Sequence, residues 1–520
     1  MDQSPIPAPS PTDGSSAAAQ EGRVRALAGR WISSSLGRRV AVAVFAGAVV
    51  ILATERLWSL HRQALRHQQA EDLLAFAIRA EQAGEYASAR CVLATLPDVE
   101  PDVARRIAPL EQRLRLLEQH REFLARADAA VADGAHRLDD SGAPDPIVGR
   151  CDEAFNSYRG LEELIREQRD EATGLNPAQA AQARHRAAEV MTVLSLRLLV
   201  QDSRTPDERA ALRRALALVD EAEELAAASH AIAALRSALH RRLGAIADAD
   251  RAAEYAAQTP PRSALDHYVV GFLAEQIDHD GSAAAAAYSR ALALAPEYYP
   301  AHAGCYTIAR SSNDGPAQVA ALTACLALRP HEAPLHFHRG LARFQLNDYF
   351  AALEDLNTCL RGRPEHSLAH YWRGRIHCLA ARWNDAEADF TAALAQDAKM
   401  GAAYAGRGLA RAHLGRDRDA VADAELATRS TRDAETTLQA ARVYGLCSRL
   451  AGKDARGAAR AEEYGARAVA VLRDAVTRGL TRRPGGREAL LANPDLDAVR
   501  GRPDFEDLLR SVETRAGHRE

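Results

Sequence analysis

Arginine and aspartate residues that could form ion pairs recur through the second half of this 520-residue chain. Each arginine precedes an aspartate by sixteen residues, and both series advance in steps of 34. The residues are Arg339, Arg373, Arg407, Asp355, Asp389 and Asp423. With the arginine on one helix and the aspartate on the next, each structural ion pair fixes the geometry of a helix hairpin, although a partly exposed pair adds little stability. A row of arginines that binds a ligand is the alternative.

A second series with the same step contains possible metal ligands. It consists of Tyr268, His302, His336, His370 and Tyr404, with His338, His366 and His377 close by in the sequence. Zinc needs its ligands within about 2.1 Å of one point, whereas packed helix layers lie roughly 10 Å apart. We therefore expect these residues to be packing positions, and we expect no metal site and no cofactor.

Motifs for enzymatic chemistry are absent from the sequence. It has no phosphate-binding G-x-x-x-x-G-K loop, no G-x-S-x-G nucleophile motif and no H-E-x-x-H pattern. The seven cysteines include no C-x-x-C pair, and Cys325 and Cys359 take places where neighbouring repeats have alanine, so we expect core residues. The net charge of −4 gives no concentrated basic face. We expect no enzyme, no small-molecule substrate and no nucleic-acid partner.

The elements that would position these residues are short helices that recur with this same step. It also relates several prolines, glycines and leucines: Pro296, Pro330, Pro364, Gly340, Gly374, Gly408, Leu292, Leu326, Leu360 and Leu394. Glycine lets two helices cross closely, and proline ends a unit because it cannot continue a helix. A composition rich in alanine, with only 5% aromatic residues, suits close-packed helices. The pattern predicts an all-α fold of helix–turn–helix units.

These units resemble the tetratricopeptide (TPR) repeat, which is a helix–turn–helix unit of about 34 residues. The resemblance implies a TPR solenoid, an α-α superhelix, with about five units over residues 263–434. The clearest units are 333–366, 367–400 and 401–434. Gly271 comes one residue early, which a one-residue insertion before the second helix would explain, and Gly304 is also out of place.

The resemblance also selects residues for a peptide-binding groove on the concave face of the array. They are Pro334, Phe337, Leu341, Phe344, Leu368, Tyr371, Arg375, Leu379, Leu409 and His413. Apolar and aromatic anchors of this kind hold a helix or an extended peptide. The lysine and asparagine residues with which some TPR proteins grip a C-terminal carboxylate are absent. Coverage of some groove residues by neighbouring helices or by the C-terminal tail is the alternative.

The N-terminal part of the chain predicts a membrane anchor. Residues 1–38 form a basic tail poor in large apolar side chains, which we expect to be disordered. The uncharged run Val40–Thr54 suggests a single transmembrane helix over residues 39–60, in contact with the membrane through residues 40–58. More arginines precede the run than follow it, which places the N-terminus in the cytoplasm and the repeats outside it. A buried soluble helix and a cleaved signal peptide are the alternatives.

The remaining segments complete the expected organisation. Residues 61–262 form an irregular helical region with degenerate TPR-like pairs, and residues 435–520 form a C-terminal helical cap. The array followed by LLANPDLDAVRGRPDFEDLL, which begins at Leu490, resembles the C-terminal TPR half of bacterial membrane serine/threonine kinases. The kinase domain itself is missing. The sequence favours a non-catalytic, membrane-anchored TPR scaffold for a protein or peptide partner, and the alternative is a regulatory subunit of a kinase signalling system.

Overall fold

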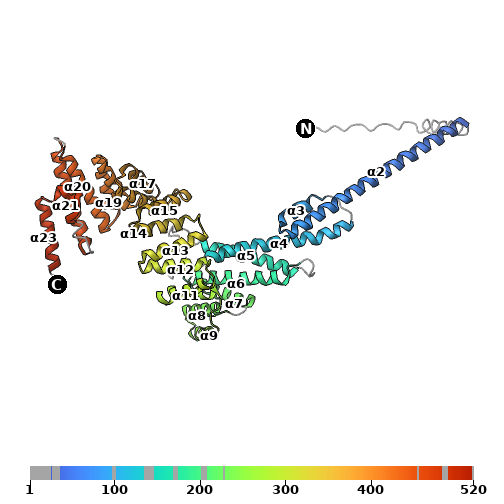
Figure 1. Cartoon of the computed structure of the whole chain (residues 1–520), viewed down its shortest axis with the longest axis horizontal. Helices are drawn as coiled ribbons and strands as arrows, with labels where there is room; N and C mark the ends of the chain where they lie inside the picture. The colour runs from blue at the N-terminus through green and yellow to red at the C-terminus, as the bar shows by residue number, and fades with distance from the viewer. Residues whose placement is uncertain are drawn as a thin grey trace, which may run out of the picture. The chain divides into compact units, whose positions relative to one another are not determined.

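Helices make up all of the regular structure in the described part of the chain (Figure 1), which confirms the all-α class. The computed structural model describes residues 25, 35–96, 101–133, 146–167, 174–200, 208–226, 229–453, 456–482 and 490–517. Most of the predicted tail, residues 1–38, lies outside these ranges. The chain divides into two compact units, Met1–Glu122 with Arg159–Ala180 and Phe123–Tyr158 with Ala181–Glu520.

The first unit is built around the C-terminal part of a long helix. Its elements are α2 (Ser35–Gln82), α3 (Tyr86–Ala94) and parts of α4 (Pro101–Asp133), α5 (Pro146–Glu167) and α6 (Pro177–Leu199). Leu74 of α2, Leu93 of α3 and Ile107 of α4 belong to one buried cluster. Gly84 turns the chain between α2 and α3 with a φ of 77°, which residues with a Cβ seldom adopt.

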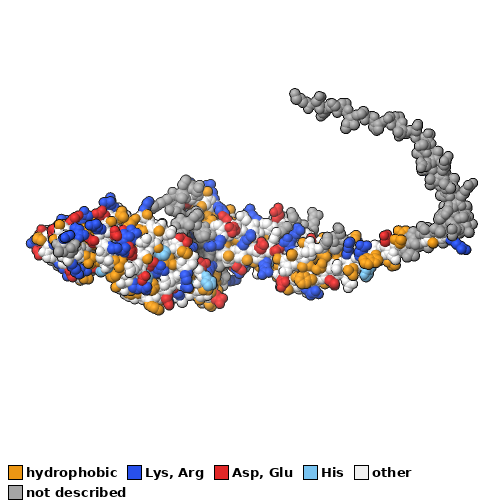
Figure 2. All heavy atoms as spheres, turned by 90° about the horizontal axis from the view of Figure 1, so that it is seen from above, with side chains coloured by type: hydrophobic (Ala, Val, Ile, Leu, Met, Phe, Trp, Pro, Cys, Tyr) orange, Lys and Arg blue, Asp and Glu red, His pale blue; other side chains and the backbone are white. Residues whose placement is uncertain are grey.

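Between Val49 and Leu65, α2 carries exposed apolar side chains, and Figure 2 draws hydrophobic side chains in orange. Its uncharged run covers only Val40–Thr54, and the charged residues Glu55 and Arg56 follow on the same helix. Among the residues described, no helix is long and apolar enough to cross a membrane. The transmembrane helix predicted at residues 39–60 is therefore not supported.

The second unit is a succession of helix pairs, from α8 to α21 (Figure 1). An earlier helix, α7 (Glu208–Leu225), packs on α8. The pairs are α8 (His230–Leu243) with α9 (Ile246–Gln258), α10 (Ala264–Gln276) with α11 (Gly281–Leu294), α12 (Tyr299–Ser311) with α13 (Gly315–Leu328), α14 (Ala333–Gln345) with α15 (Tyr349–Gly362), α16 (Ser367–Leu379) with α17 (Trp383–Gln396), α18 (Gly401–His413) with α19 (Asp417–Ser430), and α20 (Ala434–Ala451) with α21 (Ala458–Thr477). One further pair, α8 with α9, thus precedes the five that the repeat pattern revealed.

The helix boundaries follow the repeat step of the sequence with one exception. The second helices of the five pairs from α10 to α19 begin at Gly281, Gly315, Tyr349, Trp383 and Asp417, which are evenly spaced at that step. The first helix α10 begins one residue earlier than the step requires, because four residues separate α10 from α11 and three separate α12 from α13. This confirms the predicted insertion before the second helix.

The turn inside each of these pairs repeats a residue in the left-handed conformation. The residues are His279, Asn313, Asn347, Ala381 and Gly415, with φ between 55° and 79°. In three pairs the next residue is an aspartate, Asp280, Asp314 or Asp348, whose carboxylate accepts hydrogen bonds from backbone N–H groups of the second helix. Arg382 and Arg416 take this place in the last two pairs and form no such cap.

Aromatic rings occupy space that glycines leave between neighbouring pairs. Phe390 of α17 lies against Gly406 of α18, where a Cβ would come within 2.5 Å of the ring. Tyr288 of α11 lies between Gly271 of α10 and Gly304 of α12, where a Cβ would come within 2.6 and 2.5 Å. The two glycines that depart from the repeat pattern are therefore needed by one buried ring.

The last pair is longer than the others and is closed by the C-terminal segment. Helices α20 and α21 have 18 and 20 residues, whereas the helices from α10 to α19 have 13 or 14. Two short 3-10 helices, η1 (Leu480–Arg482) and η2 (Pro494–Val499), and helix α23 (Pro503–Gly517) complete this part. Leu496 and Phe505 join the buried cluster of α20 and α21.

Candidate functional site

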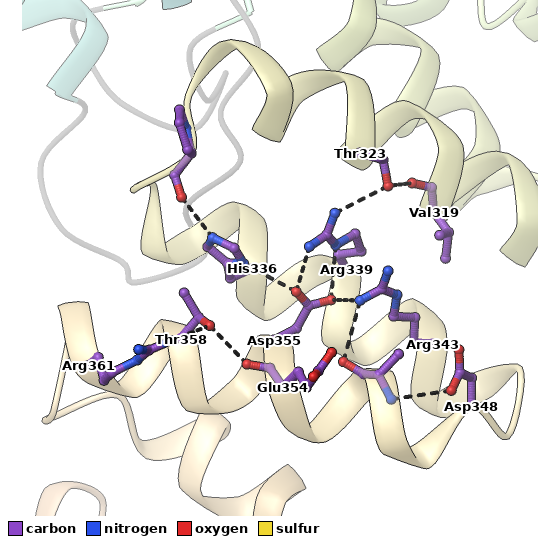
Figure 3. Close-up of polar contacts among 12 residues, drawn as sticks. Val319, Thr323, His336, Arg339, Arg343, Asp348, Glu354, Asp355, Thr358 and Arg361 are labelled. Carbon is purple, nitrogen blue, oxygen red and sulfur yellow. Dashed lines mark hydrogen bonds and ion pairs between the residues drawn. The ribbon is translucent and has the colours of Figure 1, made fainter.

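A buried carboxylate lies at the centre of the pair formed by α14 and α15. Asp355 is only 3% exposed, and three side chains of α14 point toward it (Figure 3). Arg339 donates from Nε to Oδ2 over 2.9 Å and from Nη2 to Oδ1 over 2.7 Å. Arg343 donates to Oδ2 over 2.8 Å, and Nδ1 of His336 lies 3.2 Å from Oδ1. The carboxylate is therefore fully surrounded by donors.

The next two pairs repeat this arrangement. Asp389 binds Arg373 through bonds of 2.6 to 3.1 Å, and Nδ1 of His370 lies 3.3 Å from it. Asp423 accepts from Arg407 over 2.7 and 3.0 Å. The structure thus brings together each arginine and aspartate that the sequence analysis paired.

A second donor ladder, four residues further along each first helix, was missed in the sequence. Arg343 and Arg411 donate to Asp355 and Asp423 over 2.8 and 2.9 Å, and Nε2 of His377 lies 3.5 Å from Asp389. These three donors also follow the repeat step, which is the signal that would have found them.

Some of these arginines also reach the preceding pair. Arg339 donates to Thr323 of α13 over 3.3 Å (Figure 3), and Arg373 donates to Asn357 of α15 over 2.8 Å. The ladder therefore connects neighbouring pairs as well as the two helices of one pair. Its carboxylates are only 2 to 5% exposed, so these ion pairs are more deeply buried than the partly exposed pairs expected from the sequence. Breaking a buried pair leaves an uncompensated charge and is strongly destabilising.

The histidine series holds the turn that precedes each first helix. Nε2 of His302, His336 and His370 lies 2.8 to 2.9 Å from the carbonyl oxygen of the proline six residues earlier. Each imidazole thus contacts a backbone carbonyl through Nε2, and those of His336 and His370 also contact a carboxylate through Nδ1. Among the residues described, no three His, Cys, Asp or Glu side chains are grouped as metal ligands.

The predicted groove residues of α16 form one stripe along that helix. Leu368, Tyr371, Arg375 and Leu379 are spaced three or four residues apart, so they share a face. Leu368 and Leu379, at the two ends, are 40% and 60% exposed. Tyr371 and Arg375, between them, are half-buried.

The predicted residues of α14 are less available. Phe337 is 5% exposed, with its ring 4.6 Å from that of His366, so it is a core residue rather than a groove anchor. Phe344 is half-buried, and its ring lies 4.9 Å from that of Trp372. Pro334 and Leu341 are half-buried. Coverage by neighbouring helices, the alternative raised from the sequence, applies to Phe337.

On α18, the two predicted residues differ in their surroundings. Leu409 is 7% exposed. The imidazole of His413 stacks on the indole of Trp383, with ring centroids 3.8 Å apart and an angle of 5° between the planes. Burial lowers the pKa of His413, partly offset by the charge of Asp495. We expect this ring to be neutral near pH 7, as part of an aromatic stack.

A pocket of about 190 Å³ lies between the first helices α16, α18 and α20, with α17 behind it. We call it the α16–α20 pocket. Its lining residues are Tyr371, Arg375, Cys378, Leu379, Trp383, Phe390, Ala402, Gly406, Leu409, Glu435, Thr436, Gln439 and Arg442. Four predicted groove residues, Tyr371, Arg375, Leu379 and Leu409, meet here. The other six predicted residues are not part of its lining.

The wall that α20 contributes was missed in the sequence. Glu435, Gln439 and Arg442 lie on one face of α20, at spacings of four and three. The Gln439 amide donates to Glu435 over 3.0 Å and accepts from Arg442 over 2.6 Å. Arg442 also donates to the buried Asp495 over 2.9 Å. The spacing of these three residues is visible in the sequence. The repeat pattern ends before α20, however, so it does not align α20 with α16 and α18.

Two arginines line the pocket, and they differ in their partners. Arg442 is paired with Asp495, whereas the guanidinium of Arg375 lies over aromatic rings, 4.8 Å from the centroid of Trp372 and 5.0 Å from that of Phe344. Within the described residues, Arg375 forms no ion pair with a carboxylate. Burial raises the pKa of Tyr371, partly offset by the charge of Arg375. The pocket thus presents the Arg375 cation beside the apolar side chains of α16, α17 and α18, with the polar residues Glu435 and Gln439 on α20.

The cysteine in the pocket is not activated for chemistry. Burial raises the pKa of Cys378 to about 12, although the charges of Arg442 and Arg375 act in the opposite direction. A thiol with such a pKa is neutral at pH 7, and the thiolate is the nucleophilic form. The arrangement therefore suits binding through shape, apolar contact and one positive charge.

Comparison with known proteins does not assign the chain to a family. No protein-family model matches the chain, and no curated protein matches it. Among solved structures, the APC/C hetero-tetramer Cut9–Hcn1 is 15% identical, with a TM-score of 0.34 over 85% of this chain and 90% of that one. A tetratricopeptide repeat protein from Parabacteroides merdae is 14% identical, with a TM-score of 0.30 over 61% and 99%.

YrrB, described as a TPR protein with an unusual peptide-binding site, is a further similar structure. It is 17% identical, with a TM-score of 0.25 over 41% of this chain and 96% of that one. At such identities and TM-scores, these likenesses carry no argument about function. They add nothing to the kinase resemblance seen in the sequence.

Proposed function

We propose that this protein is a non-catalytic scaffold that binds a protein or peptide partner in the α16–α20 pocket. The observation that supports the proposal is the pocket itself, where aromatic and apolar side chains of α16, α17 and α18 and polar side chains of α20 face one space. Tyr371 of α16 and Leu409 of α18 supply apolar surface, and Gln439 of α20 supplies an amide that can form hydrogen bonds. Grooves of this kind hold helical or extended peptides through a few anchor side chains.

The size of the pocket favours a side chain of a polypeptide over a whole small molecule. Small-molecule and cofactor sites usually occupy about 300–1,000 Å³, and this pocket measures about 190 Å³. Leu379, which is 60% exposed, extends the apolar surface beyond the pocket. A peptide can place one side chain inside while its neighbours cover such exposed residues.

The proposal does not depend on where the protein resides. The membrane anchor over residues 39–60, the position of the repeats outside the cytoplasm and the role in a kinase signalling system stay predictions from the sequence. A fusion of alkaline phosphatase to the C-terminus tests the second of these, because the enzyme is active only outside the cytoplasm.

Selection of peptides on the purified full-length protein tests the proposed function. We expect a displayed library of random dodecapeptides to yield binders whose affinity falls at least tenfold on Ala402→Trp, which fills the pocket. Ala286→Trp is the matched control, because Ala286 is exposed on the second helix α11, away from the pocket. Thermal unfolding by circular dichroism checks that both variants fold. Binders that tolerate Ala402→Trp as well as Ala286→Trp would contradict the proposal.

A further inference from the structure

We propose that the α16–α20 pocket recognises an acidic side chain within an internal, partly apolar segment of the partner polypeptide. Arg375 would bind that carboxylate. The inference rests on the proposed function and names the chemistry of the partner. It follows from the position of one cation, from the groups that already surround it and from the apolar residues on either side of it.

The first step is the contrast between Arg375 and three other arginines of these helices. Arg373, Arg407 and Arg442 each donate to an aspartate that is no more than 5% exposed. The contacts of Arg375 are instead with three aromatic rings, at 4.8, 5.0 and 5.9 Å from their centroids, and with the Tyr371 side chain through a hydrogen bond. A half-buried guanidinium without a carboxylate leaves charge available to a ligand.

The second step is the way in which the rings hold this guanidinium. A cation within about 6 Å of an aromatic centroid is attracted by the negative face of the ring. The guanidinium carries five N–H donors, and its hydrogen bond to the Tyr371 side chain leaves others for a ligand. Two parallel N–H donors match the two oxygens of a carboxylate. The rings of Phe344 and Trp372 thus position Arg375 for a bidentate contact.

The third step is the polarity of the pocket. Glu435 lines the opposite wall on α20, and its carboxylate accepts from the Gln439 amide. The other cation on that wall, Arg442, is paired with Asp495, so an acidic ligand group is attracted to Arg375 on α16 and repelled by Glu435 on α20. This difference fixes the direction in which the acidic side chain enters.

The fourth step identifies the ligand as an internal segment rather than a chain end. Leu368 lies seven residues before Arg375 and Leu379 four residues after it, on the same stripe of α16. At about 1.5 Å per residue these leucines lie roughly 10 and 6 Å along the helix from Arg375. Both are exposed, by 40% and 60%. A polypeptide that covers both must continue on either side of its acidic residue.

The test uses synthetic peptides derived from the library selection, with amidated C-termini so that no terminal carboxylate is present. We expect the selected sequences to share an aspartate or glutamate flanked by large apolar residues. Fluorescence anisotropy should show at least tenfold weaker binding to Arg375→Gln. Arg375→Met keeps the apolar stem against the rings and should show the same loss. Replacing the peptide's acid with its amide should weaken binding to the wild type at least tenfold and leave binding to Arg375→Gln nearly unchanged.

The outcomes separate this inference from the proposed function. If peptides depend on Ala402 but bind wild type and Arg375→Gln equally, the carboxylate inference is wrong and the scaffold function stands. If the selected peptides bind only with a free C-terminal carboxylate and not when amidated, the inference that the ligand is an internal segment is wrong. If no selected peptide distinguishes Ala402→Trp from Ala286→Trp, the proposed function fails, and the inference fails with it.

Discussion

Arg373 and Arg375 lie two residues apart on the same helix and have opposite surroundings. Arg373 points to the seam between α16 and α17, where it binds the buried Asp389 and also reaches Asn357 of the preceding pair. Arg375 points to the stripe that faces the α16–α20 pocket and lies among aromatic rings. Residues at i and i+2 of a helix do not share a face. One turn of α16 therefore carries both a structural arginine and an arginine whose charge is available to a ligand.

The two positions also differ in how they repeat. The seam position has an arginine in three consecutive pairs, Arg339, Arg373 and Arg407, each with its own buried aspartate. The pocket position changes from Leu341 to Arg375 to Leu409. A feature that every pair needs for packing recurs at the repeat distance, whereas a feature that serves one site need not. Recurrence thus distinguishes structural roles from candidate binding roles in this array.

Removal of the carboxylate in the seam should give the largest loss of stability. Asp389→Ala leaves Arg373 and His370 without their anion, and removing one partner of a buried pair costs about 3–5 kcal/mol. Asp385→Ala is the control, because Asp385 lies on the same helix but is exposed and pairs with Arg382 near the surface. The control should change the free energy of unfolding by about 0.5 kcal/mol or less.

Urea unfolding followed by circular dichroism measures both variants. A difference between them below about 1 kcal/mol would show that the buried carboxylate contributes no more than a surface charge. Such a result would contradict the structural role assigned to Arg373.

Matched substitutions of the two arginines should give a smaller but more direct contrast. Arg373→Gln removes the charged contact with Asp389 and should cost about 1.5–3 kcal/mol in total, because His370 remains beside the carboxylate. Arg375→Gln removes cation–π contacts worth about 0.5–1 kcal/mol at a partly exposed site. In binding, the order should reverse: Arg375→Gln weakens acidic peptides, and Arg373→Gln leaves their affinity unchanged while the protein is folded. Equal effects of both variants on stability and on binding would contradict the division of roles.

The sequence was informative wherever a requirement recurs. The helix pairs, the insertion before α11 and the pairing of Arg339 with Asp355 all follow from positions that repeat at one distance. Such positions repeat because each pair must solve the same packing problem against the next. The second donors, Arg343 and Arg411, recur in the same way and were available to the same reasoning.

The candidate site was harder to predict because burial depends on neighbours that are distant in the sequence. Phe337 and Tyr371 take the same place in successive pairs, yet the first is a core residue and the second lines the pocket. The ring of His366 packs against that of Phe337, and no local sequence pattern indicates this contact. Glu435 and Gln439 lie beyond the clear repeats, so their position relative to α18 could be determined only from the structure. The membrane prediction at residues 39–60 relied on composition alone and found no support.

The acid dependence of stability should distinguish the seam from the surface. Burial alone would raise the pKa of Asp389, but hydrogen bonds from His370 and Arg373 and the charges of Arg373 and His377 outweigh it, so its pKa lies below the ordinary 3.8. A carboxyl with a lowered pKa in the folded state stabilises the fold at pH values above its unfolded pKa. That contribution is lost as the pH falls below about 4 toward the folded pKa. Asp389→Asn should therefore unfold with a weaker dependence on pH in this range than the wild type.

Urea midpoints measured at intervals between pH 2.5 and 6 provide the slope for each protein. Asp385→Asn serves as the control and should keep the wild-type slope. If Asp389→Asn and the wild type show the same slope below pH 4, the carboxylate is not held in its charged form by the seam.

The smallest effect should come from the turns, where the repeat tolerates different residues at one backbone conformation. Ala381 and Gly415 occupy equivalent positions with φ of 55° and 79°. The left-handed conformation costs a residue with a Cβ roughly 1–2 kcal/mol, and part of this is offset because glycine loses more entropy on folding. Ala381→Gly should therefore raise the free energy of unfolding by about 0.5–1 kcal/mol, and Gly415→Ala should lower it by a similar amount.

Steric contact does not complicate the glycine, because nothing lies within 4 Å of the Cβ that Gly415→Ala would add. Ala380→Gly, one residue earlier and outside the left-handed region, is the control and should destabilise. Opposite signs for Ala381→Gly and Ala380→Gly in thermal unfolding would show that the repeated turn imposes its conformation on whichever residue occupies it. The same sign for both would mean that residue 381 relaxes from the left-handed conformation in solution, and that the turn, unlike the arginine seam, is not held alike in every pair.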